Sequence, residues 1–315
     1  MNLLVTIAIP TYHRLTYLQE AVASAQAQTY APIEILVGDD GPTVEIGAWC
    51  RAVMRQDPRV RYQRNPRNLG LAGNWNALAN AAHGEFTAII GDDDRLLPEF
   101  AGRLAAALEP QGDVAFANHY LISERGARLE AESRQHTREF RRDRLPAGLL
   151  ANAEGWIWQN VVPMSASLSR TDNLRRLRFK EDLNTPEIEL FLRLAQAGGK
   201  FVFVPDYLAE YRAHPDSATA AGLWGERLAE YLLPMPATPP VEPFKRQFMA
   251  RLLVGAVSRC LLAGERERAR RFLRSGYFPA SPRARVWLQS LCTWLPTAVG
   301  TGLYRAAHRF RRPFP

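Results

Sequence analysis

The chain has 315 residues, enough for one large α/β domain or for one domain with an appendage. Hydrophobic residues make up 47% and charged residues 23%, which is ordinary globular composition. Cys50, Cys260 and Cys292 lie far apart and form no CxxC motif. This spacing argues against a disulfide framework or a metal–thiolate site and favours a reducing compartment.

The formal net charge of +8 is unevenly distributed along the chain. From Val241 onward there are 15 lysines and arginines against 3 acidic residues, so the first 240 residues carry a net charge of −4. A basic and apolar C-terminal region is typical of proteins that contact an anionic membrane surface or nucleic acid. The first 240 residues give no such indication.

Strand and helix patterns alternate over the first 90 residues. Thr16 is a candidate N-cap for the first helix. Because the N-terminal apolar stretch ends at Pro10 and has no basic residues before it, we expect a strand there and not a signal peptide. The alternation predicts an α/β fold with a mostly parallel sheet flanked by helices. The expected strands are residues 4–9, 33–37, 60–63 and 86–90, and the later helices are 44–56 and 68–82.

The remainder of the chain is less regular. Residues 123–146 are polar and rich in arginine, which predicts a hairpin and an exposed loop. The Pro-rich stretch 233–243 predicts a linker between a domain of residues 1–232 and a basic, amphipathic helical extension of residues 244–315. Further strands are expected at residues 114–122, 161–168 and 200–204.

Three adjacent carboxylates, Asp92-Asp93-Asp94, follow the strand at residues 86–90 after Gly91. Like charges this close are unfavourable unless a cation or hydrogen-bond donors neutralise them, and hard oxygen ligands suit Mg²⁺ or Mn²⁺ that holds a phosphate. An acidic turn that caps the next helix is the alternative. Asp39-Asp40 ends another strand, and ligands bind beyond the carboxyl ends of strands in such sheets. This favours a binding site.

Several short motifs occur in a defined order. They are Ile7-Ala8-Ile9-Pro10-Thr11-Tyr12, Glu34 to Gly41, Asn68-Leu69-Gly70, Gly84-Glu85-Phe86, Gly91 to Asp94 with Pro98, Glu187 to Arg193 and Tyr211 to His214. Taken together, the motifs resemble those of family 2 glycosyltransferases with the GT-A fold. His13 stands where that family usually has Asn, and Gly91 stands where it usually has the first Asp of its metal motif.

The resemblance implies a metal-dependent, inverting glycosyltransferase. It would move a sugar from a nucleotide sugar, with UDP the expected nucleotide, to a glycan or lipid-linked acceptor in bacterial surface polysaccharide assembly. A divalent cation would stabilise the charge that develops on the leaving diphosphate. Asp93 would be the main ligand of Mn²⁺ or Mg²⁺, Asp92 would lie between metal, ribose and phosphates, and His214 would reach metal or diphosphate. Asp94 would orient the site.

The same resemblance implies a pocket for the nucleotide. Tyr12 would pack on the base, and Asp39 or Asp40 would accept a hydrogen bond from it. For Asn68 and Gly70, an N-cap and a tight turn are an alternative that is compatible with this role. The residues implied to contact the nucleotide sugar are Pro10, Tyr12, Asp39, Asp40, Asn68, Gly70, Asp92 and Arg212.

Glu187 takes the position of the family's usual catalytic Asp, and we expect it to be the general base. Thr185 and Pro186 are typical of an N-cap and first helical position, which places Glu187 in a first helical turn. The helix dipole favours an ionised carboxylate there, although first-turn acids are also common for stability alone. The competing candidates are Glu181, Asp182 and Glu189.

Three tryptophans are candidate stacking platforms for a sugar acceptor. Trp156 and Trp158 are the two we favour, and Trp75 is the third. Packing in the core is the more frequent role of tryptophan and remains the alternative.

The C-terminal region predicts paired amphipathic helices over residues 245–274. Residues 286–304 approach the length of a bilayer span, but their hydrophobicity is modest, so we expect an interfacial anchor. Trp287 and Trp294 would lie among lipid headgroups. A helical hairpin packed on the core is the alternative. The arginines expected to face anionic lipid are Arg305, Arg309, Arg311 and Arg312.

We therefore expect a cytoplasmic protein held peripherally on the inner face of the cytoplasmic membrane. Nucleic acid is not an expected partner, because the arginine-rich tail lacks interleaved stacking residues. Two rival functions remain. One is a catalytically inactive relative that binds glycan or scaffolds a membrane complex. The other is a sugar-phosphate nucleotidyltransferase, but Pro10-Thr11-Tyr12-His13 is not the glycine-rich phosphate loop that it would need.

Overall fold

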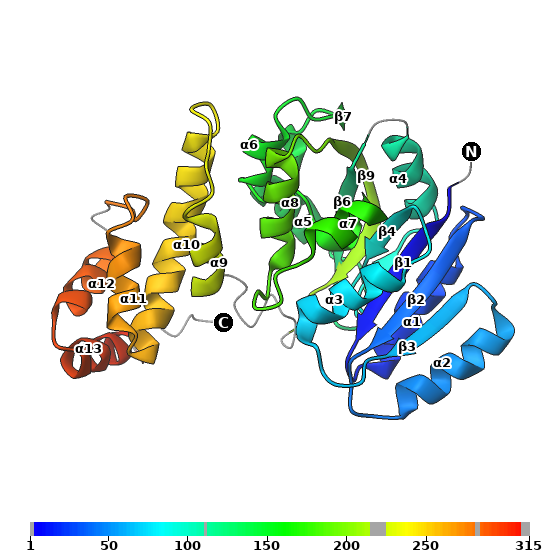
Figure 1. Ribbon diagram of the computed structural model, residues 1–315, viewed down its shortest axis with the longest axis horizontal. Coiled ribbons are helices and arrows are strands. Elements are labelled where there is room, and N and C mark those ends of the chain that lie inside the picture. Colours follow the sequence, from blue (N-terminus) through cyan, green and yellow to red (C-terminus); the bar gives the residue numbers. More distant parts are fainter. Residues whose placement is uncertain (1–2, 110–111, 215–224, 281–283, 310–315) are drawn as a thin grey trace. The chain divides into compact units, whose positions relative to one another are not determined.

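The computed structural model describes residues 3–109, 112–214, 225–280 and 284–309 (Figure 1). The chain divides into two compact units. The first comprises Met1–Asp182 and Pro186–Ala221, and the second comprises Leu183–Thr185 and Gly222–Pro315. The sequence predicts a domain boundary at residue 232, which lies inside the second unit, after Gly222. The predicted domain limits stay a proposal.

The first unit is built on a mixed sheet, which is nine-stranded in the described part of the chain. Its order is β3-β2-β1-β4-β8-β6-β9-β5, and β7 pairs with β9. The strands are β1 (Val5–Thr11), β2 (Ile33–Asp39), β3 (Val60–Arg64), β4 (Phe86–Ile89), β5 (Arg95–Leu96), β6 (Val114–Ile122), β7 (Gly148–Leu149), β8 (Ser167–Arg170) and β9 (Phe201–Arg212).

Strands β3, β2, β1 and β4 run parallel, while β8 lies antiparallel between β4 and β6. Strand β9 runs parallel to β6, and the predicted mostly parallel sheet is confirmed. The antiparallel pairings of β5, β7 and β8 were not predicted. Every residue of β2 is buried, which is the pattern of a parallel strand covered on both faces.

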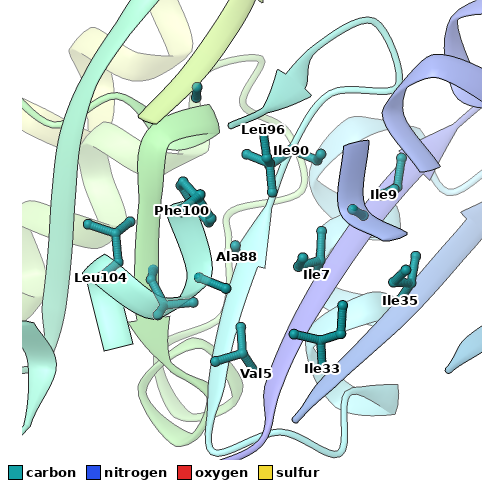
Figure 2. Close-up of a cluster of buried hydrophobic side chains, with 14 of the residues drawn as sticks. Val5, Ile7, Ile9, Ile33, Ile35, Ala88, Ile90, Leu96, Phe100 and Leu104 are labelled. Atoms are coloured by element: carbon teal, nitrogen blue, oxygen red, sulfur yellow. The ribbon is translucent and has the colours of Figure 1, made fainter. Parts of the chain in front are cut away.

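Helices cover both faces of the parallel strands (Figure 1). One core joins alternate residues of β1, β2 and β4, such as Ile7, Ile35 and Ala88, to α1, α2 and α4 (Figure 2). Helix α3 packs against β1 and β2. The helices of this unit are α1 (Leu15–Gln26), α2 (Glu45–Gln56), α3 (Gly70–Ala81), α4 (Phe100–Leu108), α5 (Glu130–Glu139), α6 (Ala153–Ile157), α7 (Thr171–Leu177) and α8 (Pro186–Gln196).

Several predicted elements were wrong. The predicted hairpin is present, with an antiparallel bridge between Ile122 and Arg128, but the exposed loop predicted after it contains α5. This polar helix packs on β6, where the buried Ser133 hydroxyl oxygen accepts from the Leu121 N–H. The strand predicted at residues 161–168 begins at Ser167, after a 3₁₀ turn at Met164–Ala166. Thr16 lies inside α1, whose N-cap is Arg14.

The second unit is helical in its described residues. It contains α9 (Glu226–Leu232), α10 (Glu242–Ala263), α11 (Arg266–Leu273), α12 (Ala284–Trp294) and α13 (Thr297–Arg309). The other helices pack on α10, which buries Phe248, Leu252 and Val257 and ends at Gly264 in the left-handed conformation. None of the described helices is both long and apolar enough to cross a membrane.

Candidate active site

The candidate site lies at the carboxyl ends of β1, β2 and β4. Thr11 is opposite Asp39 in the register of β1 and β2. Just beyond β4, the Ile90 N–H donates to the Ala8 carbonyl, and the Thr11 hydroxyl donates to Asp92 Oδ2 at 2.7 Å. The two acidic segments therefore lie at one edge of the sheet.

Asp92 is buried at this edge, with 2% of its surface exposed. Its Oδ1 forms an ion pair with Arg14 Nη2 at 2.7 Å, while Oδ2 accepts the Thr11 hydrogen bond. Burial raises the pKa of Asp92 to about 6, and the positive charge of Arg14 opposes this rise.

Asp93 brings together three segments that are distant in sequence. Its Oδ2 lies 2.8 Å from Arg14 Nη1 and 2.8 Å from His214 Nε2. The same Arg14 nitrogen lies 3.2 Å from His214 Nε2. The end of β4, the start of α1 and the residues after β9 thus converge on one carboxylate, with His214 almost completely buried.

Asp94 anchors the acidic turn, which comprises residues 91–94, through hydrogen bonds to neighbouring segments. Its Oδ1 accepts from the Arg212 backbone N–H at 3.0 Å, and its Oδ2 accepts from the Ser165 hydroxyl at 2.5 Å. Its own N–H donates to the Gly91 carbonyl at 3.2 Å. Burial and the adjacent Asp93 carboxylate raise the pKa of Asp94. These contacts agree with the orienting role expected of it.

Arg212 lies behind the turn, with 1% of its surface exposed. Its guanidinium donates to the Asp93 carbonyl at 2.8 Å and to the Glu124 carbonyl at 2.8 Å, and pairs with Glu20 at 2.7 Å. It also stacks over the Tyr17 ring at 4.6 Å. These contacts give Arg212 a structural role, and its expected contact with phosphate stays a prediction.

Asp39 and Asp40 use their carboxylates differently. Asp39 accepts from the Tyr62 hydroxyl at 2.7 Å and from the Gly41 N–H at 2.9 Å. Asp40 accepts from the N–H groups of Leu69 and Gly70 at 2.8 and 2.9 Å, which satisfies orphan donors at the start of α3.

Asn68 and Gly70 form a tight turn before α3. Asn68 Oδ1 accepts from the Gly70 N–H at 2.7 Å, and Gly70 has a φ of +73°, which favours glycine. Both residues are exposed. The helix-cap and tight-turn interpretation is therefore seen in the structure, and a contact with nucleotide remains compatible with it.

The loop after β1 carries Pro10 and Tyr12. Pro10 is half-buried and Tyr12 is 43% exposed. A Cβ atom at Gly41 would lie 1.6 Å from the Tyr12 carbonyl oxygen, so the loop after β2 must have glycine at this position. The Tyr12 ring meets the His13 ring edge-to-face at 5.1 Å and keeps an accessible surface.

Glu187 lies half-buried in the first turn of α8. Burial raises the pKa of its carboxyl group to about 7. Of the competing acids, Glu189 is held by Arg193 through two contacts of 2.7 and 2.8 Å, and Glu181 is exposed. Among described residues, no hydrogen bond or ion pair joins Glu187 to the acidic turn.

The three candidate tryptophans lie in different environments. Trp158 is completely buried and cannot stack on a sugar in this structure, which corrects its expected acceptor role. Trp75 is 9% exposed and meets Phe179 edge-to-face at 5.2 Å. Trp156 is half-buried on α6 and keeps an accessible surface.

The side chains at the acidic turn have suitable chemistry for a divalent cation, since carboxylates and an imidazole meet there. However, Arg14 already contacts both Asp92 and Asp93. Within the described ranges, no three His, Cys, Asp or Glu side chains form a group that could hold an ion. The carboxylates and the imidazole fit a cation by their chemistry, and such a cation would need further ligands from a bound molecule.

Sequence reasoning missed Arg14 and Ser165. Arg14 lies two residues after Tyr12, the last residue of the first-strand motif. This closeness to the motif is the sequence signal that could have indicated it. Ser165 gave no signal, because its contact with Asp94 joins residues 71 positions apart.

A model described as glycosyl transferase family 2 matches residues 6–172, more than half of the chain. The chain belongs to glycosyl transferase family 2. Glycosyltransferase GlyG of Streptococcus pneumoniae is 34% identical over 125 residues, which cover 39% of this chain and 42% of that relative. The GalNAc(5)-diNAcBac-PP-undecaprenol β-1,3-glucosyltransferase of Campylobacter jejuni is 32% identical over 93 residues, covering 29% and 30%.

Solved structures show that this member of glycosyl transferase family 2 has a GT-A-type fold. TarS residues 1–349 of Staphylococcus aureus, in complex with UDP, gives a TM-score of 0.67 at 15% identity and covers 99% of this chain and 93% of that one. The mannosyltransferase PcManGT of Pyrobaculum calidifontis, with GDP-Man and Mn²⁺, gives 0.60 at 16% identity, covering 96% and 84%. At these identities the likeness concerns the fold alone.

Proposed function

We propose that this family 2 glycosyltransferase transfers a sugar from a UDP-linked donor to a hydroxyl group of a glycan or lipid-linked acceptor, with inversion at the anomeric carbon. The observation that carries the proposal is the meeting of Asp92, Asp93, Arg14 and His214 at the carboxyl edge of a parallel sheet. Charged groups of both signs gathered at this edge suit a nucleoside diphosphate. The TarS complexes with UDP and UDP-GlcNAc support the choice of donor.

The nucleotide would lie along the ends of β1 and β2. Tyr12 would pack on the base, with Pro10 beside it. Each carboxylate oxygen has two acceptor sites, so Asp39 can accept from a base N–H while it keeps Tyr62 and Gly41. Asp40 would act indirectly, because it fixes the start of α3.

Asp93, Asp92 and His214 are the residues that would hold Mn²⁺ or Mg²⁺ together with oxygens of the diphosphate. When bound, the cation supplies Lewis-acid stabilisation of the leaving group. The Mn²⁺ in the PcManGT complex supports the choice of a divalent cation. Asp94 and Arg212 would keep the turn in place through contacts to both its main chain and its side chains.

Glu187 would remove the proton from the attacking acceptor hydroxyl. A carboxyl group with a pKa of about 7 is suited to a general base near neutral pH. Attack from the face opposite the leaving diphosphate inverts the anomeric centre. Trp156, whose surface is partly accessible, is the remaining aromatic candidate for an acceptor contact.

We also propose a membrane setting, on the inner face of the cytoplasmic membrane. In the second unit Trp287, Leu291 and Trp294 are exposed on α12 at helical spacing. Arg270 and Arg274 lie over the Trp294 ring at 5.3 and 5.4 Å. No acidic residue follows Glu267 in the sequence. An apolar stripe beside arginines suits an anionic bilayer surface. The C. jejuni relative, which acts on an undecaprenol-linked glycan, supports this setting.

Ligand-induced thermal stabilisation would test the donor proposal. UDP, GDP, dTDP and CMP sugars are added to the full chain with and without Mn²⁺, and we expect the largest shift for a UDP sugar with metal. Asp93→Asn should lose the metal-dependent part of the shift. No nucleotide-dependent shift with any donor would contradict the proposal, whereas binding without sugar transfer would favour an inactive relative.

A further inference from the structure

We propose that Arg14 is a built-in counter-cation that competes with a divalent cation for Asp92 and Asp93, and that donor binding relieves this competition. The inference rests on the proposed function of the site. It assigns Arg14 as a positioning residue that couples metal affinity to the presence of a nucleotide.

Arg14 is placed by the fold to bridge the acidic turn. It is the N-cap residue of α1, which begins directly after the loop that follows β1. One guanidinium nitrogen contacts Asp92 at 2.7 Å and another contacts Asp93 at 2.8 Å. A planar guanidinium can span two carboxylates in this way, whereas a lysine ammonium is a single point charge.

Arg14 neutralises only part of the negative charge of the acidic turn. Asp92 and Asp93 carry two negative charges when ionised, and Arg14 supplies one positive charge. The other nearby guanidinium, Arg212, is paired with Glu20. The turn therefore keeps an attraction for a cation, but a weaker one than two unpaired carboxylates would have.

Gly91 limits the number of carboxylates in the turn. A Cβ atom at this position would lie 2.4 Å from Asp93 Oδ1 and 3.2 Å from Asp94 Oδ2. A side chain there would displace the Asp93 carboxylate from the position in which Arg14 holds it. Asp94 has both oxygens engaged by Ser165 and Arg212. Arg14 contacts the other two carboxylates of the turn, Asp92 and Asp93.

The guanidinium can also serve a second anion. The Arg14 side chain is 30% exposed, and its five N–H groups suit the oxygens of a diphosphate. A bound diphosphate would draw Arg14 away from the carboxylates and at the same time offer its own oxygens to a cation. Metal affinity should therefore be low without nucleotide and rise when UDP is present.

Titration of the full chain with Mn²⁺, followed by the electron paramagnetic resonance signal of free Mn²⁺, tests this directly. Arg14→Gln should bind Mn²⁺ roughly tenfold more tightly than the wild type without nucleotide, since one unit of charge is removed from beside two carboxylates. UDP should raise the affinity of the wild type and raise that of Arg14→Gln much less. Arg134→Gln, which changes an exposed arginine of α5, is the matched control and should behave as wild type.

Arg14→Lys provides a second variant that keeps a positive charge for folding. Its single ammonium cannot bridge both carboxylates, so we expect Mn²⁺ affinity between those of the wild type and Arg14→Gln. Unchanged affinity in both variants would overturn the inference, and if Arg14→Gln does not fold, unchanged affinity in Arg14→Lys does so alone. Failure of the wild type to bind UDP would instead contradict the proposed function.

Discussion

Three adjacent aspartates at the end of β4 have three different surroundings. Asp92 is buried and accepts a hydrogen bond from Thr11, and Asp93 contacts Arg14 and His214. Asp94 accepts a hydrogen bond from the Arg212 backbone N–H. Their separate surroundings arise in a turn, in which the Asp94 N–H donates to the Gly91 carbonyl. A substitution at each position should therefore have a different effect.

Glu187 gives the sharpest prediction at the residue scale. Glu187→Gln removes the basic oxygen, so sugar transfer should fall by about 10²–10⁴-fold while UDP binding is kept. In the wild type, kcat/KM should rise with pH through about 7, because the carboxyl group with its raised pKa accepts a proton only after it ionises. Steady-state assays across pH 5.5–8.5 measure both effects.

Glu181→Gln is the matched control for that measurement. Glu181 is exposed and pairs with Arg178 at 3.3 Å on the surface, so its loss should leave rate and pH profile unchanged. Full transfer by Glu187→Gln would contradict the assignment of the base.

At the scale of elements, Asp40 and Arg14 each connect the start of a helix to a segment that follows a strand. Asp40 connects the end of β2 to the start of α3, and Arg14 connects the start of α1 to the turn after β4. The helices thus position loops that carry the candidate ligand contacts.

Asp40→Ala should destabilise the first unit by about 1–2 kcal/mol, the usual cost of losing a helix N-terminal cap. The Leu69 and Gly70 N–H groups would lose their acceptor. Thermal unfolding should show the lower Tm, and Asp172→Ala, which removes an exposed carboxylate, should leave Tm nearly unchanged. Equal Tm values for Asp40→Ala and wild type would argue against the capping role.

The elements that the sequence predicted well are those with strong periodicity. Residues 114–122 match β6 fully, and the strands at 33–37 and 60–63 match β2 and β3 to within a residue or two at their ends. Helix α5 was missed because tertiary contacts of Ser133 and Thr137 hold a segment with no apolar stripe. At the site, single motifs indicated Asp93 and His214, but the bridging by Arg14 depends on contacts that no local pattern contains.

At the scale of the whole molecule, charge is divided between the two units. The basic residues gather after Val241, while the part before it is slightly acidic. This division agrees with the partners proposed above, which are a nucleotide sugar with a cation for the first unit and an anionic surface for the second.

Binding to vesicles tests the surface role of the second unit. Trp287→Ser combined with Trp294→Ser should reduce co-sedimentation with phosphatidylglycerol vesicles several-fold, because the two most exposed aromatic side chains of α12 are lost. Raising the salt concentration should weaken wild-type binding. Val44→Ser, which changes an exposed residue of the first unit, is the control. Equal sedimentation of all variants would count against a lipid-facing α12.

The contact between Arg14 and His214 joins positions that are 200 residues apart. A chain emerging from the ribosome has the acidic turn after residue 94, but it lacks the imidazole and the strand that supports Asp94 until residue 214 has been made. Domains generally fold as units during synthesis, and contacts of long sequence separation form late. Binding competence should therefore appear in a single late step, and donor binding can serve as a reporter of complete folding of the first unit.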